Sequence, residues 1–428
     1  MNFTRKIIVC LLLLIGILSP NIITAQSNSK RPVILLRSGW QVENIGDIAH
    51  TPGFLALAEK YIPKAEVFFW PYYHYLPDYE VAMLKKRFPK MKIVVGKLSP
   101  DGVASTSELA DAISKSDILI NNSGPATLGW AELTAYRKAT GKPIGVYGVT
   151  YGLYGTPEKG ILSEAEFVFF RDTVSLERAK KEGIHAKIMA WGPDAAFATD
   201  VEDEPTAKAF LKANNLKDGK FICFIPKQRF TPSWLHEKKN KPLDPARDAR
   251  NEEMKDHDHA PMVEAITAVV RQTDLKVLIV SEDETEISIG KDWVWDKLPE
   301  DVKPRVVWRN TGWLTDEAVS VYKKSAGLVS HEQHSPIMCI GHDIPALLVR
   351  WEEQSSKGYM WETIGLQDWL FDFDKEADIQ RYVPAVLDIA KNPNKAKAKA
   401  KKARKVVEEK QKQTMKVVEE SFQFNLKK

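Results

Sequence analysis

Two histidines lie three positions apart in the segment His331-Glu332-Gln333-His334, directly after an apolar run. A histidine at the carboxyl end of a strand suits proton transfer, because its ordinary pKa of about 6.5 lies close to neutral pH. The same pair could hold zinc, but Pro336 disfavours two histidines on one regular helix face. We therefore expect His334 to transfer a proton and expect no metal; a purely structural histidine is the alternative.

A second candidate for proton transfer is Asp47, which lies in residues 43–47 between a predicted strand and a predicted helix. Gly46 lets the backbone approach a ligand closely, and a helix N-terminus favours anions and polar ligand groups. We therefore expect Asn44 and Gly46 to contact a substrate. The alternative for Asp47 is a capping role at the start of the helix.

Polar side chains follow two further apolar runs. Asn122 follows residues 117–120, where it either faces a ligand or forms a tight turn. Arg171 follows residues 167–170 and is expected to hold an anion, with an ion pair to Asp172 or Asp194 as the alternative. The Pro-Asp turn that contains Asp194 is expected to be structural.

Aromatic residues gather near the predicted strand ends of the first half of the chain. Their rings could stack on sugars or line the core, and the sequence does not separate these two roles. The residues concerned are Tyr72, Tyr73, Tyr75, Trp130, Tyr151 and Tyr154.

Alternating strands and helices must position these side chains. In the first half, strands are predicted at residues 32–36, 65–70, 92–95, 117–120, 143–147, 167–170 and 187–189. Helices are predicted at 51–61, 79–88, 105–114 and 131–138. This alternation indicates a parallel sheet that binds ligands at the carboxyl ends of its strands.

The second half repeats the pattern after an acidic segment, residues 201–205, that is predicted to be a linker. Strands are predicted at residues 221–225, 276–280, 327–329 and 346–349, and helices at 260–272, 316–324 and from 335. Residues 226–258 are polar and are expected to form a mobile or disordered loop, in which Asp256-His257-Asp258-His259 is solvated. The fold class is therefore α/β, with two doubly wound parallel-sheet domains (30–200 and 206–385) that face each other across a cleft, as in the glycosyltransferase-B architecture.

The two ends of the 428-residue chain differ in charge from its body. Residues 1–26 combine Arg5 and Lys6, an apolar run and small residues, which is typical of a secretory signal peptide. Residues 391–428 carry 13 basic and 4 acidic residues and are predicted to form a basic helix, mainly over 394–420. We expect an exported, periplasmic or secreted protein without a stable membrane span; the net charge of +4 gives no case for nucleic-acid binding.

Cysteine usage agrees with this size and location. Beyond the signal segment only Cys223 and Cys339 remain, each inside an apolar run. Two buried free thiols are therefore expected rather than a disulfide.

Five short motifs occur in a defined order along the chain. They are Asn44-x-Gly46-Asp47, Arg171-Asp172-x-x-Ser175, Gly192-Pro193-Asp194-x-x-Phe197, His334 ahead of residues 341–345, and Lys357. In this order the chain resembles the polysaccharide pyruvyl transferase family over residues 37–370. The resemblance implies the glycosyltransferase-B-like fold and transfer of a pyruvyl group from phosphoenolpyruvate to a sugar as a ketal, without a cofactor.

The resemblance also implies roles for individual residues. The donor phosphate would be held by Lys227 and Arg229, which follow the strand at 221–225, and His334 would act as the proton donor. Asp47 and Asn122 would lie on the side of the acceptor, a polysaccharide or oligosaccharide of the cell envelope or the extracellular space. Arg171 and Lys357 are further expected substrate contacts.

Two alternatives stay open at this point. The family commonly has an arginine two residues before the histidine, where this chain has Glu332. That difference favours an exported glycan-binding protein that kept the fold and lost catalysis. The other alternative is a glycosyltransferase that uses a nucleotide sugar.

Overall fold

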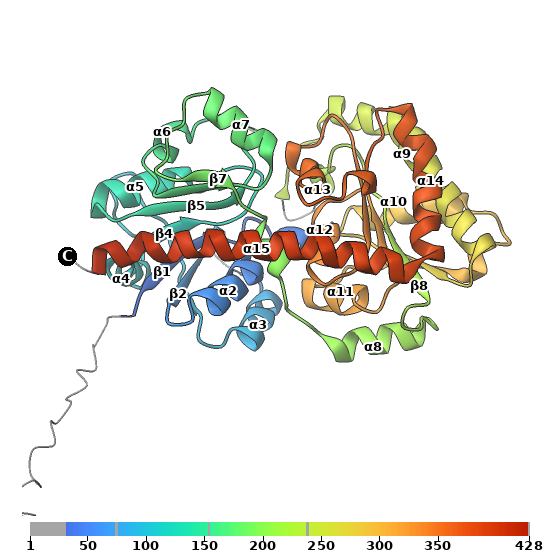
Figure 1. The fold of residues 1–428 in the computed structure, drawn as a ribbon, viewed down its shortest axis with the longest axis horizontal. Helices are drawn as coiled ribbons and strands as arrows, with labels where there is room; N and C mark the ends of the chain where they lie inside the picture. The colour runs from blue at the N-terminus through green and yellow to red at the C-terminus, as the bar shows by residue number, and fades with distance from the viewer. Residues whose placement is uncertain (1–30, 73–75, 153–154, 237–238, 427–428) are drawn as a thin grey trace, which may run out of the picture. The chain divides into compact units, whose positions relative to one another are not determined.

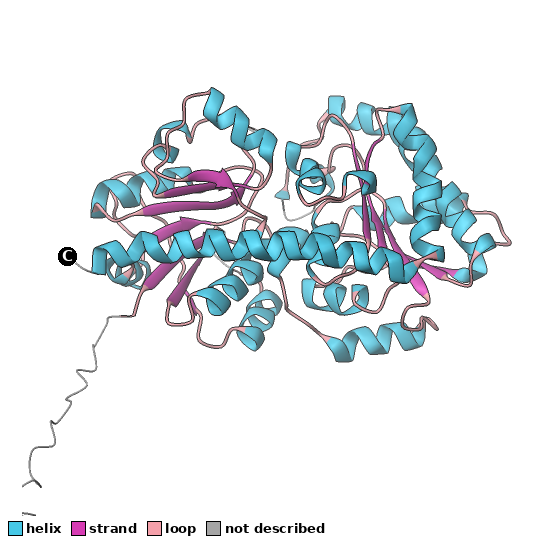
Figure 2. Cartoon of the chain, in the orientation of Figure 1, coloured by secondary structure: helices cyan, strands magenta, loops and turns pink. Residues whose placement is uncertain are grey.

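The computed structural model describes residues 31–72, 76–152, 155–236 and 239–426. Residues from Pro32 onward form one compact unit, and its strands and helices alternate (Figures 1 and 2). The strands form two parallel sheets, which confirms the predicted α/β architecture of the glycosyltransferase-B type. The predicted signal peptide, together with Tyr73, Tyr75 and Tyr154, lies outside the described residues.

The first sheet has seven strands in the order β3-β2-β1-β4-β5-β6-β7. They are β1 (Val33–Ser38), β2 (Glu66–Pro71), β3 (Lys92–Ile93), β4 (Ile118–Asn121), β5 (Ile144–Val149), β6 (Phe167–Phe170) and β7 (Met189–Trp191). Its helices are α1 (Ile45–Ile48), α2 (His50–Tyr61), α3 (Asp78–Arg87), α4 (Ser107–Lys115), α5 (Trp130–Thr140), α6 (Lys159–Leu162) and α7 (Thr173–Lys181). All pairs are parallel, and Leu35 of β1 stands between Phe68 and Leu119.

The second sheet has six strands in the order β10-β9-β8-β11-β12-β13. They are β8 (Phe221–Ile225), β9 (Lys276–Ile279), β10 (Val306–Trp308), β11 (Leu328–Ser330), β12 (Ala346–Arg350) and β13 (Leu370–Asp372). Its helices are α8 (Glu204–Ala213), α9 (Pro245–Gln272), α10 (Glu286–Ile289), α11 (Thr315–Tyr322), α12 (His334–Gly341), α13 (Met360–Thr363) and α14 (Glu376–Lys391). Every residue of β8 is buried, as expected for a parallel strand covered by helices on both faces.

Each sheet has one point at which the strand order reverses. In the first sheet it lies between β1 and β4, and in the second between β8 and β11. Ligands of open α/β sheets bind outside the carboxyl ends of the strands at such a point. The loops that follow β1 and β11 therefore carry the best-placed side chains of the two halves.

The expected loop at residues 226–258 is wrong for its second part, because helix α9 already begins at Pro245. Asp244 caps this helix by accepting a hydrogen bond from the backbone N–H of Arg247 (3.2 Å), and Pro245 is tolerated in the first turn. Asp258 and His259 are buried on the inner face of α9, so the expected solvated cluster is wrong for these two residues, whereas Asp256 and His257 are exposed as expected. The polar residues of this segment form the exposed face of a helix rather than a loop.

Several other elements differ from the sequence-based expectation. The predicted acidic linker at residues 201–205 is shorter than expected, because helix α8 already begins at Glu204. Strands β10 and β13 and helix α14 are present in the structure but were not predicted. Cys223 and Cys339 are buried free thiols, as predicted.

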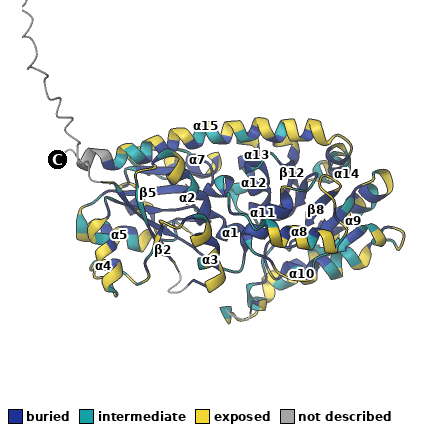
Figure 3. Cartoon of the chain, turned by 90° about the horizontal axis from the view of Figure 1, so that it is seen from below, coloured by how far each residue is buried: buried dark blue, intermediate teal, exposed yellow. Residues whose placement is uncertain are grey.

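The long C-terminal helix is confirmed as α15 (Pro393–Leu426), and it packs on both halves (Figure 1). Ala400, Ala403 and Val407 join the core of the second half, whereas Met415 and Val418 join the core of the first. These positions recur every three to four residues, so they share one helix face, and the opposite face is exposed (Figure 3). No helix among the described residues is long and apolar enough to cross a membrane.

Candidate active site

Helix α1 follows a strand of the first sheet but is anchored to the second half. The backbone N–H of Ile45 donates to the carbonyl oxygen of Glu282, which follows β9, at 3.0 Å. The hydroxyl of Thr315 donates to the carbonyl oxygen of Ile45 at 2.8 Å. The two halves therefore meet at this helix, and its residues belong to both.

Asn44 forms the cap of α1. Its Oδ1 accepts hydrogen bonds from the backbone N–H groups of Gly46 (2.8 Å) and Asp47 (3.1 Å). The alternative in which Asp47 caps the helix is therefore wrong, since Asn44 satisfies these donors. The Asp47 side chain does not cap the helix. Its Oδ2 instead accepts a hydrogen bond from the side-chain amide of Gln41.

Gly46 allows α1 to lie directly on the first turn of α12. A Cβ atom at this position would lie 2.3 Å from the Cβ of His334 and 2.5 Å from Oε1 of Glu282. Only glycine permits this approach. The close contact at Gly46 is with the protein itself, and the predicted contact with a substrate stays a prediction. The contact places Asp47 beside His334.

His334, Asp47 and Lys357 come together from three separate segments. Nε2 of His334 lies 3.7 Å from Oδ1 of Asp47 and 3.4 Å from Nζ of Lys357. Nδ1 of His334 contacts Oε1 of Glu282 at 3.2 Å. Because the Lys357 ammonium can only donate to Nε2, Nδ1 carries the imidazole proton and donates it to Glu282.

Burial and neighbouring charges set the protonation states in this cluster. Burial, and then the positive charge of Lys357, hold the pKa of His334 well below its ordinary value, so the imidazole is neutral at neutral pH. Burial raises the pKa of Asp47, and burial together with the charge of Glu332 raises the pKa of Glu282 to about 8. Burial and then the charge of Arg171 lower the pKa of Lys357. A neutral imidazole that carries no proton on Nε2 suits acceptance of a proton better than donation.

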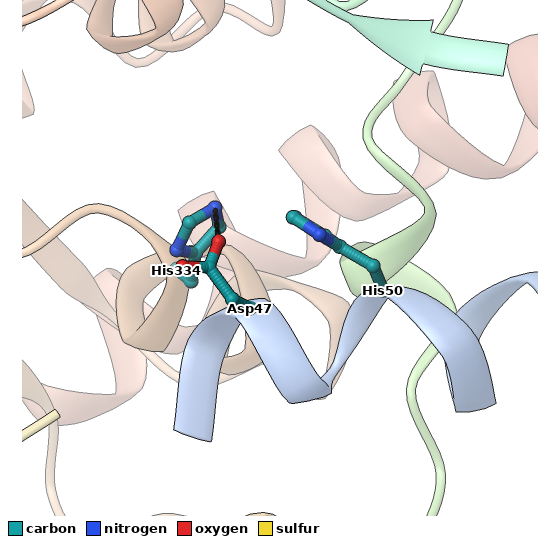
Figure 4. A group of neighbouring side chains, drawn as sticks. All are labelled: Asp47, His50 and His334. Carbon is teal, nitrogen blue, oxygen red and sulfur yellow. Dashed lines mark ion pairs between the residues drawn. The ribbon is translucent and has the colours of Figure 1, made fainter. Parts of the chain in front are cut away.

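A second histidine, His50, lies against His334 (Figure 4). The two rings meet edge to face with centroids 4.8 Å apart. Nε2 of His50 is 3.5 Å from Oδ1 of Asp194, and within the described chain neither ring nitrogen of this fully buried side chain makes a hydrogen bond. Asp194 is also buried and accepts a hydrogen bond from Nη1 of Arg171 at 2.8 Å, so the predicted alternative of an Arg171–Asp194 ion pair is confirmed.

Arg171 and Asn122 reach this cluster by different routes. Nε of Arg171 donates to the hydroxyl of Thr150 at 2.8 Å, which fixes the guanidinium at the end of β6. The buried Asn122 donates to the carbonyl oxygen of His50 (2.8 Å) and to the hydroxyl of Ser38 (3.1 Å). Asn122 therefore holds the start of α2 in place and takes a positioning role behind the site.

The two expected phosphate ligands are engaged by carboxylates. Lys227 forms an ion pair with Glu332, and its Nζ lies 3.9 Å from Oε1 of Glu286. Arg229 is paired with Asp258 (2.8 Å) and, at 2.7 Å, with Asp374. Neither cation contributes unbalanced positive charge, so the geometry does not favour them as ligands of the donor phosphate.

We expect replacement of Lys227 by methionine to lower the free energy of unfolding by about 3–5 kcal/mol, since Glu332 and Glu286 would stay buried without a counter-charge. Urea unfolding of Lys227→Met, and of Lys401→Met on the exposed side of α15 as the control, measures this effect. A variant with unchanged stability and weakened donor binding would instead make Lys227 a phosphate ligand.

The cluster of Asp47, His50 and His334 is the one group of metal-capable side chains found among the described residues, with ligand atoms within 4.8 Å of one another. The Lys357 ammonium already faces the Nε2 lone pair of His334, where a divalent cation would have to bind. We therefore assign the cluster to proton transfer. His331 takes no part, because its ring packs against Trp351 and Phe373.

Three contributors were not predicted as site residues: His50, Glu282 and Glu332. A signal for His50 exists, since it lies three positions after Asp47 and so shares its helix face. Glu282 follows strand β9 closely, and the carboxyl-end rule would have found it. Glu332 was noted only for replacing an arginine, and its pairing with Lys227 is not visible in the sequence.

Comparison with known families supports the resemblance seen in the sequence. The model of the family described as polysaccharide pyruvyl transferase matches residues 44–353. This range contains the cluster of Asp47, His50 and His334. A comparison with curated proteins finds no significant match.

Solved structures resemble the whole architecture. HepE from Anabaena in complex with UDP and glucose has a TM-score of 0.54 at 11% identity and covers 91% of this chain and 100% of its own. UDP-GlcNAc 2-epimerase from Neisseria meningitidis bound to UDP-GlcNAc has a TM-score of 0.52 at 12% identity, with the same coverage of 91% and 100%. MnaA from S. aureus with UDP has a TM-score of 0.51 at 14% identity and covers 86% and 90%. At such identities the likeness concerns the fold alone.

Proposed function

Because the chain belongs to the polysaccharide pyruvyl transferase family, we propose that it transfers a pyruvyl group from phosphoenolpyruvate to a sugar of a cell-envelope glycan. The product is a cyclic ketal on two hydroxyls of one sugar. The proposed location outside the cytoplasm rests on the signal-like pattern of residues 1–26.

The observation that carries this proposal is the meeting of a neutral histidine, a carboxylate and two cations at the ends of both sheets. Lys357 forms no ion pair within the described chain, and it lies close enough to Arg171 for the charge of Arg171 to lower its pKa. Phosphoenolpyruvate carries a phosphate and a carboxylate, which call for two cationic partners. Lys357, which has no carboxylate partner within the described chain, is therefore the proposed donor ligand in place of Lys227 and Arg229, and Arg171, although paired with Asp194, is the second cation beside it.

One cavity is lined by residues that neighbour these cations. It has a volume of about 240 Å³ and is lined by Thr150 and Ser175 of the first half and Ser355 and Ser356 of the second. Thr150 holds Arg171, and Ser356 precedes Lys357 in the chain.

The reaction balances without an oxidant, a reductant or water. Protonation of the methylene carbon of phosphoenolpyruvate makes it a methyl group, and the first sugar hydroxyl forms a bond to the adjacent carbon. That carbon then loses its bond to the phosphate oxygen, and the second hydroxyl takes the vacated position. Of the two protons lost by the sugar, one is balanced by the new methyl group and one leaves with phosphate.

Two side chains divide the proton transfers in this proposal. His334, neutral and without a proton on Nε2, accepts a proton from a sugar hydroxyl that takes the place of Lys357 at this nitrogen. Asp47, whose pKa is raised by burial, donates to the methylene carbon. The distance of 3.7 Å between Nε2 and Oδ1 lets the proton return from His334 to Asp47 through a substrate hydroxyl. Glu282 holds the imidazole in the required tautomer.

The test is an assay of the purified chain without residues 1–26, supplied with phosphoenolpyruvate and a panel of glycan acceptors. Released phosphate and a new ketal methyl signal in the proton NMR spectrum report the reaction. We expect Lys357→Met to raise KM for phosphoenolpyruvate by about 10- to 100-fold and to change kcat less, because it removes a charged contact to the donor. Lys401→Met is the matched control.

The result separates the proposal from a glycan-binding protein without catalysis. Glu332 favours that alternative. It occupies the position at which the family commonly has an arginine, and it neutralises Lys227. It predicts acceptor binding with no phosphate release by the wild-type chain. Phosphate release that is indifferent to Lys357→Met would contradict the donor site proposed here.

A further inference from the structure

Exposed aromatic side chains gather around a single loop. Among the large hydrophobic side chains that are exposed in the described residues, Tyr72 (42%), Tyr79 (40%) and Trp130 (38%) are the aromatic ones. They come from the end of β2, from α3 and from the start of α5, so nothing in the chain order requires them to meet. All three adjoin the loop of residues 39–43 that connects β1 to α1.

Individual contacts place Tyr72 and Tyr79 at this loop, and the residue before Trp130 lies beside it. The ring of Tyr72 lies 5.6 Å from that of Trp40, and Arg37 lies over the Tyr72 ring at 5.1 Å. The hydroxyl of Tyr79 donates to the carbonyl oxygen of Val42 at 3.4 Å. Trp130 directly follows Gly129, whose Cβ position would lie 3.7 Å from the Trp40 ring and 3.1 Å from Cγ of Arg37.

The same loop leads into the active site. Gln41, the residue between Trp40 and Val42, donates a hydrogen bond to Oδ2 of Asp47. Trp40 is itself buried and anchored, because its indole N–H donates to the carbonyl oxygen of Ser123. Tyr72 and Tyr79 therefore contact the two residues that flank Gln41, the direct partner of Asp47. The hydrogen bond of Trp40 fixes this loop to the first sheet.

We propose that Tyr72, Tyr79 and Trp130 form an aromatic platform that binds sugar rings of the acceptor glycan next to the sugar that is modified. Rings with an apolar face and a polar edge can stack on the C–H faces of sugars while neighbouring polar groups meet the hydroxyls. The cation beneath the platform is balanced, because Arg37 pairs with Glu132 at 2.6 Å, so the surface suits an uncharged chain of sugars rather than an anion. This proposal deepens the proposed function and rests on it for the nature of the ligand.

The test measures binding without phosphoenolpyruvate, so its outcome does not depend on catalysis. Neutral oligosaccharides of two to six glucose, galactose or mannose units, in α and β linkage, are titrated into the chain by calorimetry. We expect affinity to rise with length for at least one series. Tyr72→Ala and Trp130→Ala are each expected to weaken the tightest ligand by about five- to tenfold, the effect of one lost stacking contact.

Two further variants separate stacking from a structural role. Tyr72→Phe keeps the ring and should bind like the wild type, whereas a loss equal to that of Tyr72→Ala would contradict stacking. Ile188→Ala, at an exposed apolar position before β7, is the control and should change nothing. The proposal is overturned if no oligosaccharide binds, if the alanine variants bind like the wild type, or if they disrupt a dimer instead. Sugar binding by a chain that releases no phosphate would reject the proposed reaction and keep the platform.

Discussion

Replacement of His334 by alanine is expected to lower kcat for pyruvyl transfer by about 10²–10⁴-fold, the usual contribution of a positioned acid–base group. The reason is the position of Nε2, 3.7 Å from Asp47 and 3.4 Å from Lys357, because the proposed reaction has this nitrogen accept the proton of the acceptor hydroxyl. Phosphate release and the ketal methyl signal measure the effect. His185→Ala, on the exposed turn before β7, is the matched control.

The pH profile adds a second readout to the same prediction. Burial and Lys357 keep the pKa of His334 well below about 6.5, so the basic form persists through the neutral range and kcat/KM should fall only below that pH. Lys357→Met removes the neighbouring positive charge, which favours the protonated imidazole. The acidic limb of its profile should therefore move to higher pH.

Other outcomes would reject the assigned role. If His334→Ala kept wild-type turnover, the imidazole would be a structural residue and Asp47 would remain as the single candidate. An acidic limb that does not move in Lys357→Met would show that another group controls it. Thermal unfolding of each variant separates a loss of chemistry from a loss of folded protein.

Replacement of Gly46 by alanine is expected to have the other large effect, through packing rather than chemistry. Its Cβ would lie 2.3 Å from the Cβ of His334 and 2.5 Å from Oε1 of Glu282, and α1 would have to move away from α12. Overpacking of this kind costs about 1–3 kcal/mol. A displacement of about 1 Å at reacting groups can also cost about 10²-fold in turnover. Urea unfolding and the phosphate assay measure the two effects separately.

The control for this variant is Gly160→Ala in helix α6. No atom of the described residues lies within 4 Å of the Cβ position there, so alanine should leave stability unchanged or raise it by up to about 1 kcal/mol. Activity should stay at the wild-type level. Equal stability losses in both variants, or a fully active Gly46→Ala, would contradict the close contact between α1 and α12.

Local patterns accounted for much of the fold and for part of the site. Apolar runs such as residues 221–225 and 167–170 became buried parallel strands, because a strand covered on both faces must be apolar at every position. The residues after those runs marked the ligand edge of each sheet, and Asp47, Arg171 and His334 could be selected from that edge. The polar stretch at 226–258 is the exception, because its second part is a helix whose wide solvent face has the composition of a loop.

By itself, the sequence determined the class of fold, the repeated sheet and the residues that end each strand, since these depend on neighbours within about ten positions. Only the tertiary structure decided which charges are free to act. Lys227 is neutralised by Glu332, 105 positions away, and Arg229 by Glu353, 124 positions away, whereas Lys357 has no such partner in the described part of the chain. An ion pair between distant segments leaves no local pattern, because its energy depends on a distance that only the packed sheets define.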